Sequence, residues 1–313
     1  MRNTYDASTL VSAKKPFLNL DQAKYLSKWT LSGVAFRIAQ RIGLHRDSDS
    51  NASLTPFQLE YRRRLWRQLI ILDHTSSELA GSAPNYSILL TLGDARLPAY
   101  VNDIDLDPEM SELPQAREGA TDMIFCSLRY EFSGSFLHIS RGSSTKFYPY
   151  PQPLATKDTL LTEKDQKINE LENRIGEKYL RFCDPLVPLH NLTLIAARSA
   201  MSGMRLRAHH PRQYADGGAN LPQSEKDVLF SLSLKILQYD SLVHATKSLQ
   251  RFLWHVRIYF QWHALIYLLS ELRLRKIGDE ADAAWDQVEE VFHHHPEMIR
   301  DSDHTLYIAI RSL

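Results

Sequence analysis

The sequence predicts an all-α protein, an irregular domain built from many helices. Apolar residues recur at helical spacing in most segments of the 313-residue chain, and helix-start and helix-stop residues flank several of these segments. Sustained alternation of apolar and polar residues, the pattern of a half-buried strand, occurs nowhere. We expect an N-terminal extension over residues 1–25, followed by one domain over residues 26–313.

Charge and cysteine content exclude several function classes. The chain carries 37 basic and 37 acidic residues, so no overall positive field concentrates it on DNA or on an anionic membrane. Only Cys126 and Cys183 occur, too few thiols for a four-cysteine zinc site or a disulfide framework. The most apolar stretch, residues 258–269, is shorter than the roughly 20 residues that span a bilayer. We expect no direct nucleic-acid binding, no metal, no cofactor and no membrane span.

The first predicted helix lies in KYLSKWTLSGVAFRIAQRIGL, where Gly43 is the expected C-terminal stop. Its apolar residues are spaced by two to four positions, close to a helical period on average: Leu26, Trp29, Leu31, Val34, Ile38 and Ile42. This composition predicts a well-buried helix.

A second helix is predicted over residues 55–79, TPFQLEYRRRLWRQLIILDHTSSEL. Thr55 is the N-cap, Pro56 occupies the first helical position, and Gln58 completes a capping box. The run from Arg62 to Arg64 could contact phosphates, but a DNA-reading element normally comes with a basic surface or a known reading module. We therefore interpret these arginines as structural, with Glu60 able to pair with Arg63 or Arg64.

An ordered surface loop is predicted over residues 92–116. Asp103, Asp105 and Asp107 imitate the start of a calcium loop, but prolines occupy the positions where an EF-hand requires glycine and glutamate. We expect this acidic loop to accept hydrogen bonds from helix ends or arginines.

The second half of the chain continues with helices. One is predicted over residues 121–132, and a loop-rich interruption follows near residues 141–162. A charged helix then carries a narrow apolar stripe formed by Ile168, Leu171, Ile175 and Phe182. Further helices are expected in HNLTLIAARSAMSGMRLRAHH, SEKDVLFSLSLKILQYDSLVHA and EADAAWDQVEEVFHHHP, with one long helix over residues 250–276.

Aromatic and imidazole groups on the predicted long helix form a candidate ligand pocket. His255 and His263 are eight positions apart and would share one face, with Trp254 and Trp262 on the adjoining face. Trp66 completes the set of pocket candidates. Such residues are more often core packing with one satisfied polar tip.

No known catalytic motif is present, so the sequence does not indicate an enzymatic role. If the protein were an enzyme, His255, His263 and Asp73 would be the residues to test. The histidines at 293–295, like those at 209–210, are consecutive and would fan about 100° apart on a helix. They cannot converge on a metal without ligands from elsewhere.

Three segments together resemble the fungal-specific transcription factor domain, the middle regulatory region of fungal binuclear zinc-cluster regulators. They are GVAFRIAQRIGLHRD, TPFQLEYRRRLWRQLIILD and LPAYVNDIDLDPEM, and TDMIFCSLRYEF and YFQWHALIYLLSELRLRKIGDEADAAWDQVEEVF extend the similarity over residues 26–292. The resemblance implies an all-helical regulatory module of the nucleus that modulates transcription and senses a small metabolite. Glu60, Arg63, Arg64 and Asp73 lie in the shared motif, and no catalytic residue is implied.

Two departures from the family pattern shape the expected function. These residues contain no six-cysteine zinc cluster, and by comparison with the family we expect the regulatory domain to begin late, in a truncated form. We therefore expect a transcription-regulator-like protein that regulates a secondary-metabolite gene cluster through protein partners. The partner is either a second copy or a full-length regulator, and the location is the nucleus, with the cytoplasm as the alternative. The rival hypothesis is a helical domain that binds a small molecule and acts as a cyclase or isomerase.

Overall fold

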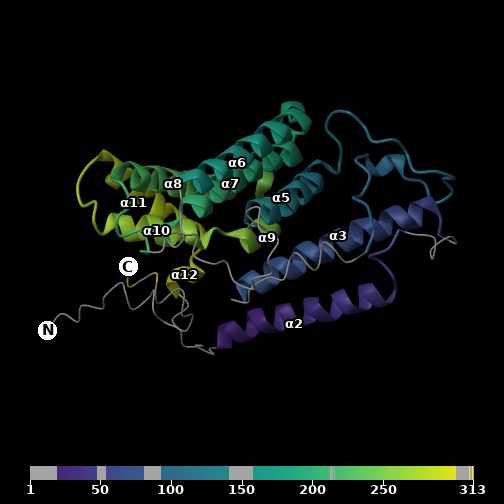
Figure 1. Ribbon diagram of the computed structural model, residues 1–313, viewed down its shortest axis with the longest axis horizontal. Coiled ribbons are helices and arrows are strands. Elements are labelled where there is room, and N and C mark those ends of the chain that lie inside the picture. The colour runs from purple at the N-terminus through teal and green to yellow at the C-terminus, as the bar shows by residue number, and fades with distance from the viewer. Residues whose placement is uncertain are drawn as a thin grey trace.

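The computed structural model describes residues 20–47, 54–80, 93–140, 158–211, 214, 216–300, 310 and 312. All regular structure in these ranges is helical, so the predicted all-α fold is confirmed (Figure 1). The longer helices are α2 (Leu20–Arg41), α3 (Pro56–Leu79), α5 (Ile124–Ser140), α6 (Asp158–Lys178), α7 (Pro188–His209), α8 (Gln223–Ala245), α10 (Trp262–Leu272) and α11 (Asp279–His294). The shorter ones are η2 (Asp103–Asp105), η3 (Leu180–Phe182), η5 (Lys247–Phe252), α9 (Leu253–Val256), η6 (Arg257–Tyr259) and α12 (Glu297–Arg300).

The predicted ends of α2 and α3 are confirmed by local geometry. The backbone N–H of Gln58 donates to Thr55 Oγ1 at 3.2 Å, and Gln58 Oε1 accepts from the N–H of Thr55 at 3.1 Å, which is the capping box. Gly43, with φ 72°, lies two residues after Arg41, the last residue of α2. Helix α2 begins at Leu20, inside the predicted extension, and residues 1–19 lie outside the described residues.

Two hydrophobic clusters form the centre of the molecule. Helices α5, α6 and α7 enclose one cluster, in which Ile168, Leu171 and Ile175 of the predicted stripe are at most 1% exposed. Helices α8, α10 and α11 enclose the other, and the end of α7 contributes to it. Of the predicted loop near 141–162, residues 141–157 lie outside the described residues, and α6 begins at Asp158.

The expected long helix over residues 250–276 is wrong, because the chain breaks into η5, α9, η6 and α10. Phe260 and Gln261 separate η6 from α10 with ψ angles of 133° and 74°. Residues 254–260 are mostly aromatic or β-branched, so they gain little from a helix. Breaking the helix lets Phe260, 9% exposed, join the core against Trp262 and His295.

The expectation that α2 is well buried is also wrong. Its buried positions include Ser32, Phe36 and Ala39. Its large apolar residues Leu31, Val34 and Ile38, with Ile42 just after its last residue, are between 44% and 68% exposed. Average spacing predicted the helix but could not select its buried face. Within the described ranges α3 is the one element in extensive contact with α2, and the two lie side by side along one edge (Figure 1).

The chain crossing at Gly93 yields a stability prediction. Gly93 has φ 89°, and a Cβ there would lie 1.8 Å from the backbone oxygen of His45. Gly119 has φ 102° with nothing within 4 Å of its Cβ, so Gly119→Ala isolates the backbone strain. Gly93→Ala should lower the free energy of unfolding by at least about 1 kcal/mol more than Gly119→Ala does. Urea denaturation followed by circular dichroism measures both, and equal losses would contradict the close approach.

Candidate functional site

The arginine run of α3 is held by the preceding and following segments. Arg62 Nη2 donates to the backbone oxygen of Ile42 at 2.6 Å, which ties the end of α2 to α3. Arg63 Nε donates to Asp47 Oδ2 at 2.8 Å, and the backbone N–H of Arg96 donates to the same oxygen at 2.9 Å. Asp47 therefore joins α3 to the segment that begins at residue 93.

Glu60 stands at the centre of this network and is fully buried. Its Oε1 accepts from Arg64 Nε at 3.0 Å, and its Oε2 accepts from the backbone N–H of Ala99 at 3.0 Å. Arg64 Nη1 also donates to Asp103 Oδ1 at 2.7 Å. Both carboxylate oxygens of Glu60 are thus used to fasten the loop across α3.

The acidic loop is bound by arginines and backbone donors. Arg117 forms a two-pronged pair with Asp105, and the backbone N–H of Asn102 donates to Asp105 at 2.9 Å. The Arg117 guanidinium, with the Asn102 N–H, holds the pKa of the Asp105 carboxyl below its ordinary value. Asp73, the remaining acid of the shared motif, accepts from the hydroxyl of Ser32 at 2.7 Å. The motif residues are therefore engaged in joining α2, α3 and the loop.

A cavity of about 250 Å³ lies where α3, α5, α7 and α8 meet the broken segment around α9. Its walls are mainly apolar and include a few polar side chains. The polar and aromatic residues on its walls include Phe125, Arg129, Asp240, His255, Tyr259 and Gln261.

His255 is the central titratable group of this cavity. Its ring centroid lies 5.4 Å from that of Phe125 and 4.9 Å from that of Tyr259. Burial, with a smaller contribution from the Arg129 charge, lowers the pKa of His255 to about 4. The imidazole is therefore neutral at pH 7, and it can donate or accept a hydrogen bond there.

Arg129 supplies a fixed cation beside this neutral ring. Its guanidinium carbon lies 4.9 Å from the centre of the Tyr259 ring, and it donates to the Tyr259 hydroxyl. Gln261, in the break between η6 and α10, adds an amide to the wall. Together they suit an aromatic or anionic small molecule, held by one cation and oriented by neutral donors.

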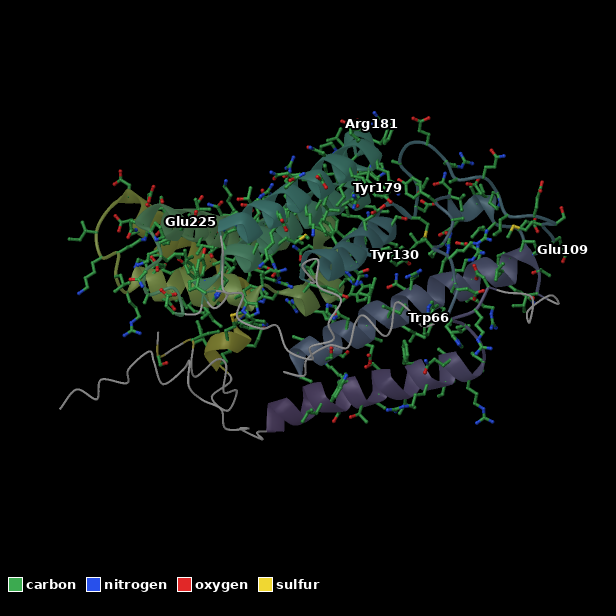
Figure 2. All side chains as sticks on the ribbon, viewed as in Figure 1. Trp66, Glu109, Tyr130, Tyr179, Arg181 and Glu225 are labelled. Carbon is green, nitrogen blue, oxygen red and sulfur yellow. The ribbon has the colours of Figure 1, made fainter. Side chains whose placement is uncertain are left out.

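A larger hollow of about 540 Å³ lies between the loop and the ends of α5 and α6, near Tyr130, Tyr179 and Arg181 (Figure 2). Charged groups on its walls pair with one another, as Lys178 does with Glu131 at 2.7 Å. We take the smaller cavity as the candidate ligand site, because of these two it is the one that contains a histidine, the half-buried His255, beside a cation.

Comparison with known proteins decides the family. Residues 14–177, just over half of the chain, match the fungal specific transcription factor domain. The chain belongs to this family. The matched segment contains the whole Glu60 network and the first two sides of the cavity, α3 and α5.

Three curated relatives of this transcription factor domain carry regulatory names. It is 36% identical to the aurofusarin cluster transcription factor aurR2 of Gibberella zeae, over 91% of this chain and 41% of the relative. The transcriptional regulator AacuB of Aspergillus aculeatus is 32% identical, over 82% of this chain and 34% of the relative. The pyriculol/pyriculariol biosynthesis cluster transcription factor 1 of Pyricularia oryzae is 28% identical, over 95% and 40%. The chain thus spans between 34% and 41% of the length of these relatives.

Among solved structures, none matches this domain. Within the described part of the chain, every helix is too short or too polar to cross a membrane.

Of the pocket candidates on the expected long helix, His255 alone lines the cavity. Trp254 is 71% exposed, Trp262 packs on Phe260 at 4.7 Å, and the ring of His263 lies 6.4 Å from that of His210. The break at Gln261 is the reason, because it removes the common helical face that the spacing implied.

Trp66 and Asp73 belong to the contact between α3 and α2. Trp66 is 2% exposed and packs against Phe36, with ring centroids 4.8 Å apart, between the two helices (Figure 2). The three residues to test for catalysis, Asp73, His255 and His263, have separate surroundings in this domain.

Sequence reasoning missed Arg129, Tyr259 and Gln261 as cavity residues. Tyr259 and Gln261 are two positions apart, but Arg129 of α5 lies 130 positions before Tyr259, so no short spacing connects it to them. The aromatic run at residues 254–262 was the available signal, and it pointed to the correct segment.

The buried network yields a second stability prediction. In Glu60→Gln the new amide places a buried NH₂ against a donor, either Arg64 Nε or the N–H of Ala99. The free energy of unfolding should fall by about 2 to 4 kcal/mol. Glu109→Gln, at an exposed loop position (Figure 2), is the matched control and should change it by less than about 0.5 kcal/mol. Two similar denaturation midpoints would exclude Glu60 as the anchor of the loop.

His255 predicts a pH dependence. Its folded-state pKa of about 4 lies below the unfolded value of 6.5, so the unfolded chain takes up the proton first. Stability is therefore complete above pH 6.5 and falls as pH decreases toward 4, by about 3 kcal/mol for this group. His255→Gln should fall less steeply over that window in urea titrations at each pH. Parallel profiles for the two proteins, or an NMR titration of the His255 ring near pH 6.5, would contradict this assignment.

Proposed function

We propose that this domain is the regulatory part of a transcription regulator that controls a secondary-metabolite gene cluster through protein partners in the nucleus. Membership of the family and the names of the relatives support the regulatory role. The arginines of α3 are bonded within the domain, to Glu60, Asp47 and Asp103 among others. This favours contact with proteins over contact with phosphates.

One observation carries the proposal of a protein partner. Leu31, Val34, Ile38 and Ile42, which we name the α2 stripe, follow helical spacing and are between 44% and 68% exposed. An exposed apolar row of this kind is typical of a protein interaction surface. The partner is either a second copy of this domain or a full-length regulator.

The cavity favours a second function, the binding of a small molecule. A neutral His255, the Arg129 cation and the Gln261 amide could hold a metabolite that modulates regulation. The same groups could hold a flexible substrate in a reactive conformation, as a cyclase or isomerase would.

A genetic experiment tests the regulatory role and the stripe together. The gene is deleted, or replaced by a variant with Leu31→Glu and Ile38→Glu, or by Ile104→Glu, a control outside the stripe that is 90% exposed. We expect transcripts of the neighbouring cluster genes to fall in the deletion strain. They should fall similarly in the stripe variant, because buried glutamates would oppose docking, and stay unchanged in the control.

The outcomes separate the hypotheses when protein levels are matched. Unchanged transcripts in the deletion strain, with one product lost and its precursor accumulated, would refute the regulatory role and support an enzymatic one. Reduced transcripts in the deletion strain but wild-type transcripts in the stripe variant would refute docking through α2 and leave regulation in place.

A further inference from the structure

Two histidines and an aspartate from distant parts of the chain converge between α8 and α11. The three side chains are Asp240, His244 and His295, and each offers one ligand atom within 4.8 Å of the others. Asp240 Oδ2 lies 2.7 Å from His295 Nε2 and 3.5 Å from His244 Nδ1. The two helices lie side by side, so this contact is part of the C-terminal core (Figure 1).

The cluster is withdrawn from water and incompletely hydrogen-bonded. The side chains of His244 and His295 are 3% exposed and that of Asp240 is 10% exposed. His244 Nδ1 lies 3.0 Å from the backbone oxygen of Asp240, whereas His244 Nε2 is buried with no hydrogen-bond partner among the described residues. The nitrogen that faces Asp240 Oδ2 is Nδ1, so Nδ1 is the His244 atom available to a shared ion, and it would exchange its contact with the backbone oxygen for the ion.

We propose that Asp240, His244 and His295 bind a divalent transition-metal ion of the zinc type. Imidazole nitrogens and a carboxylate are ligands that zinc prefers, at about 2.0 to 2.2 Å. A tetrahedral ion with such bonds needs donor atoms about 3.3 Å apart. The present separations of 2.7 Å, 3.5 Å and at most 4.8 Å bracket that value, so modest side-chain rotations complete the site.

The surroundings of the ligands fit a metal site. Glu297 Oε1 lies 3.4 Å from His295 Nδ1, the ring nitrogen that does not face Asp240. A carboxylate on the outer nitrogen of a ligating histidine fixes the ring and raises its basicity. Three protein ligands leave a fourth position, and Asp240, which also lines the cavity, places the ion beside it. Water or an oxygen of a cavity ligand would take that position.

The fold supplies what the consecutive histidines lack. Residues 293 and 294 end α11, whereas His295 is its C-cap, with φ −124° and ψ 61°, and leaves the helical path. Its ring therefore turns to α8, where Asp240 and His244 are separated by one helical turn. The sequence-based argument against a metal assumed that all three histidines remain on a helix.

Cobalt(II) binding to the purified full-length chain tests the proposal, since cobalt replaces zinc and its visible absorption reports coordination. We expect the absorption of a four-coordinate ion at one equivalent, lost when zinc is added, and a raised Tm with zinc. His295→Gln and Asp240→Asn should weaken binding more than about 100-fold, because even loss of an outer partner costs 10- to 100-fold. His293→Gln, on the same helix but exposed, is the matched control and should bind as wild type does.

The wild-type spectrum decides the question even if a buried variant folds poorly. A six-coordinate spectrum, or no binding at micromolar ion, would overturn the proposal. So would equal affinity of the folded His295→Gln, Asp240→Asn and wild-type chains, because the ion would then sit on other surface groups.

Discussion

One fully buried carboxylate constrains the N-terminal half of the domain. Glu60 has two oxygens and uses each for a different donor, the Arg64 side chain and the backbone N–H of Ala99. A buried carboxylate is tolerated only when its oxygens are satisfied, so the loop must cross α3 at this point. Asp47 has a similar role, because its Oδ2 accepts from Arg63, about one turn of α3 after Glu60, and from the backbone N–H of Arg96. The arginine run thus positions the loop, and the loop in turn meets α5 through Asp122, which accepts from the backbone of Asp103.

In the C-terminal half, the chain breaks its helix between η6 and α10 because tertiary packing there outweighs the tendency to continue the helix. A continuous helix through Phe260 would have aligned the aromatic residues on two faces. The actual chain turns at Gln261, buries Phe260 beside His295 and leaves Tyr259 against Arg129. The cavity and the His295 contact both depend on this turn, because each uses a residue from its immediate neighbourhood.

The contacts that could be predicted from the sequence are those between residues close together in the chain. The Thr55–Gln58 capping box and the Glu60–Arg64 pair span three and four residues, and both follow from helical geometry. The partners Asp47 and Asp103 lie 16 and 39 positions from their arginines, so only their chemical type could be expected. The buried face of α2 could not be predicted, because apolar residues occur on all sides of this helix. The cavity and the Asp240 cluster could not be predicted either. Their residues come from separate helices, and no local spacing in the sequence indicates that they converge.

Asp240 connects the cavity with the proposed metal site. It borders the cavity, and its Oδ2 contacts His295, the C-cap of α11. A ligand that reached Asp240 or the proposed ion would therefore change the contact that holds the end of α11 against α8. A ligand shifts a conformational equilibrium only through different affinities for two states. Because Asp240 borders the cavity and contacts His295 directly, such a ligand would act on the end of α11 through a single side chain.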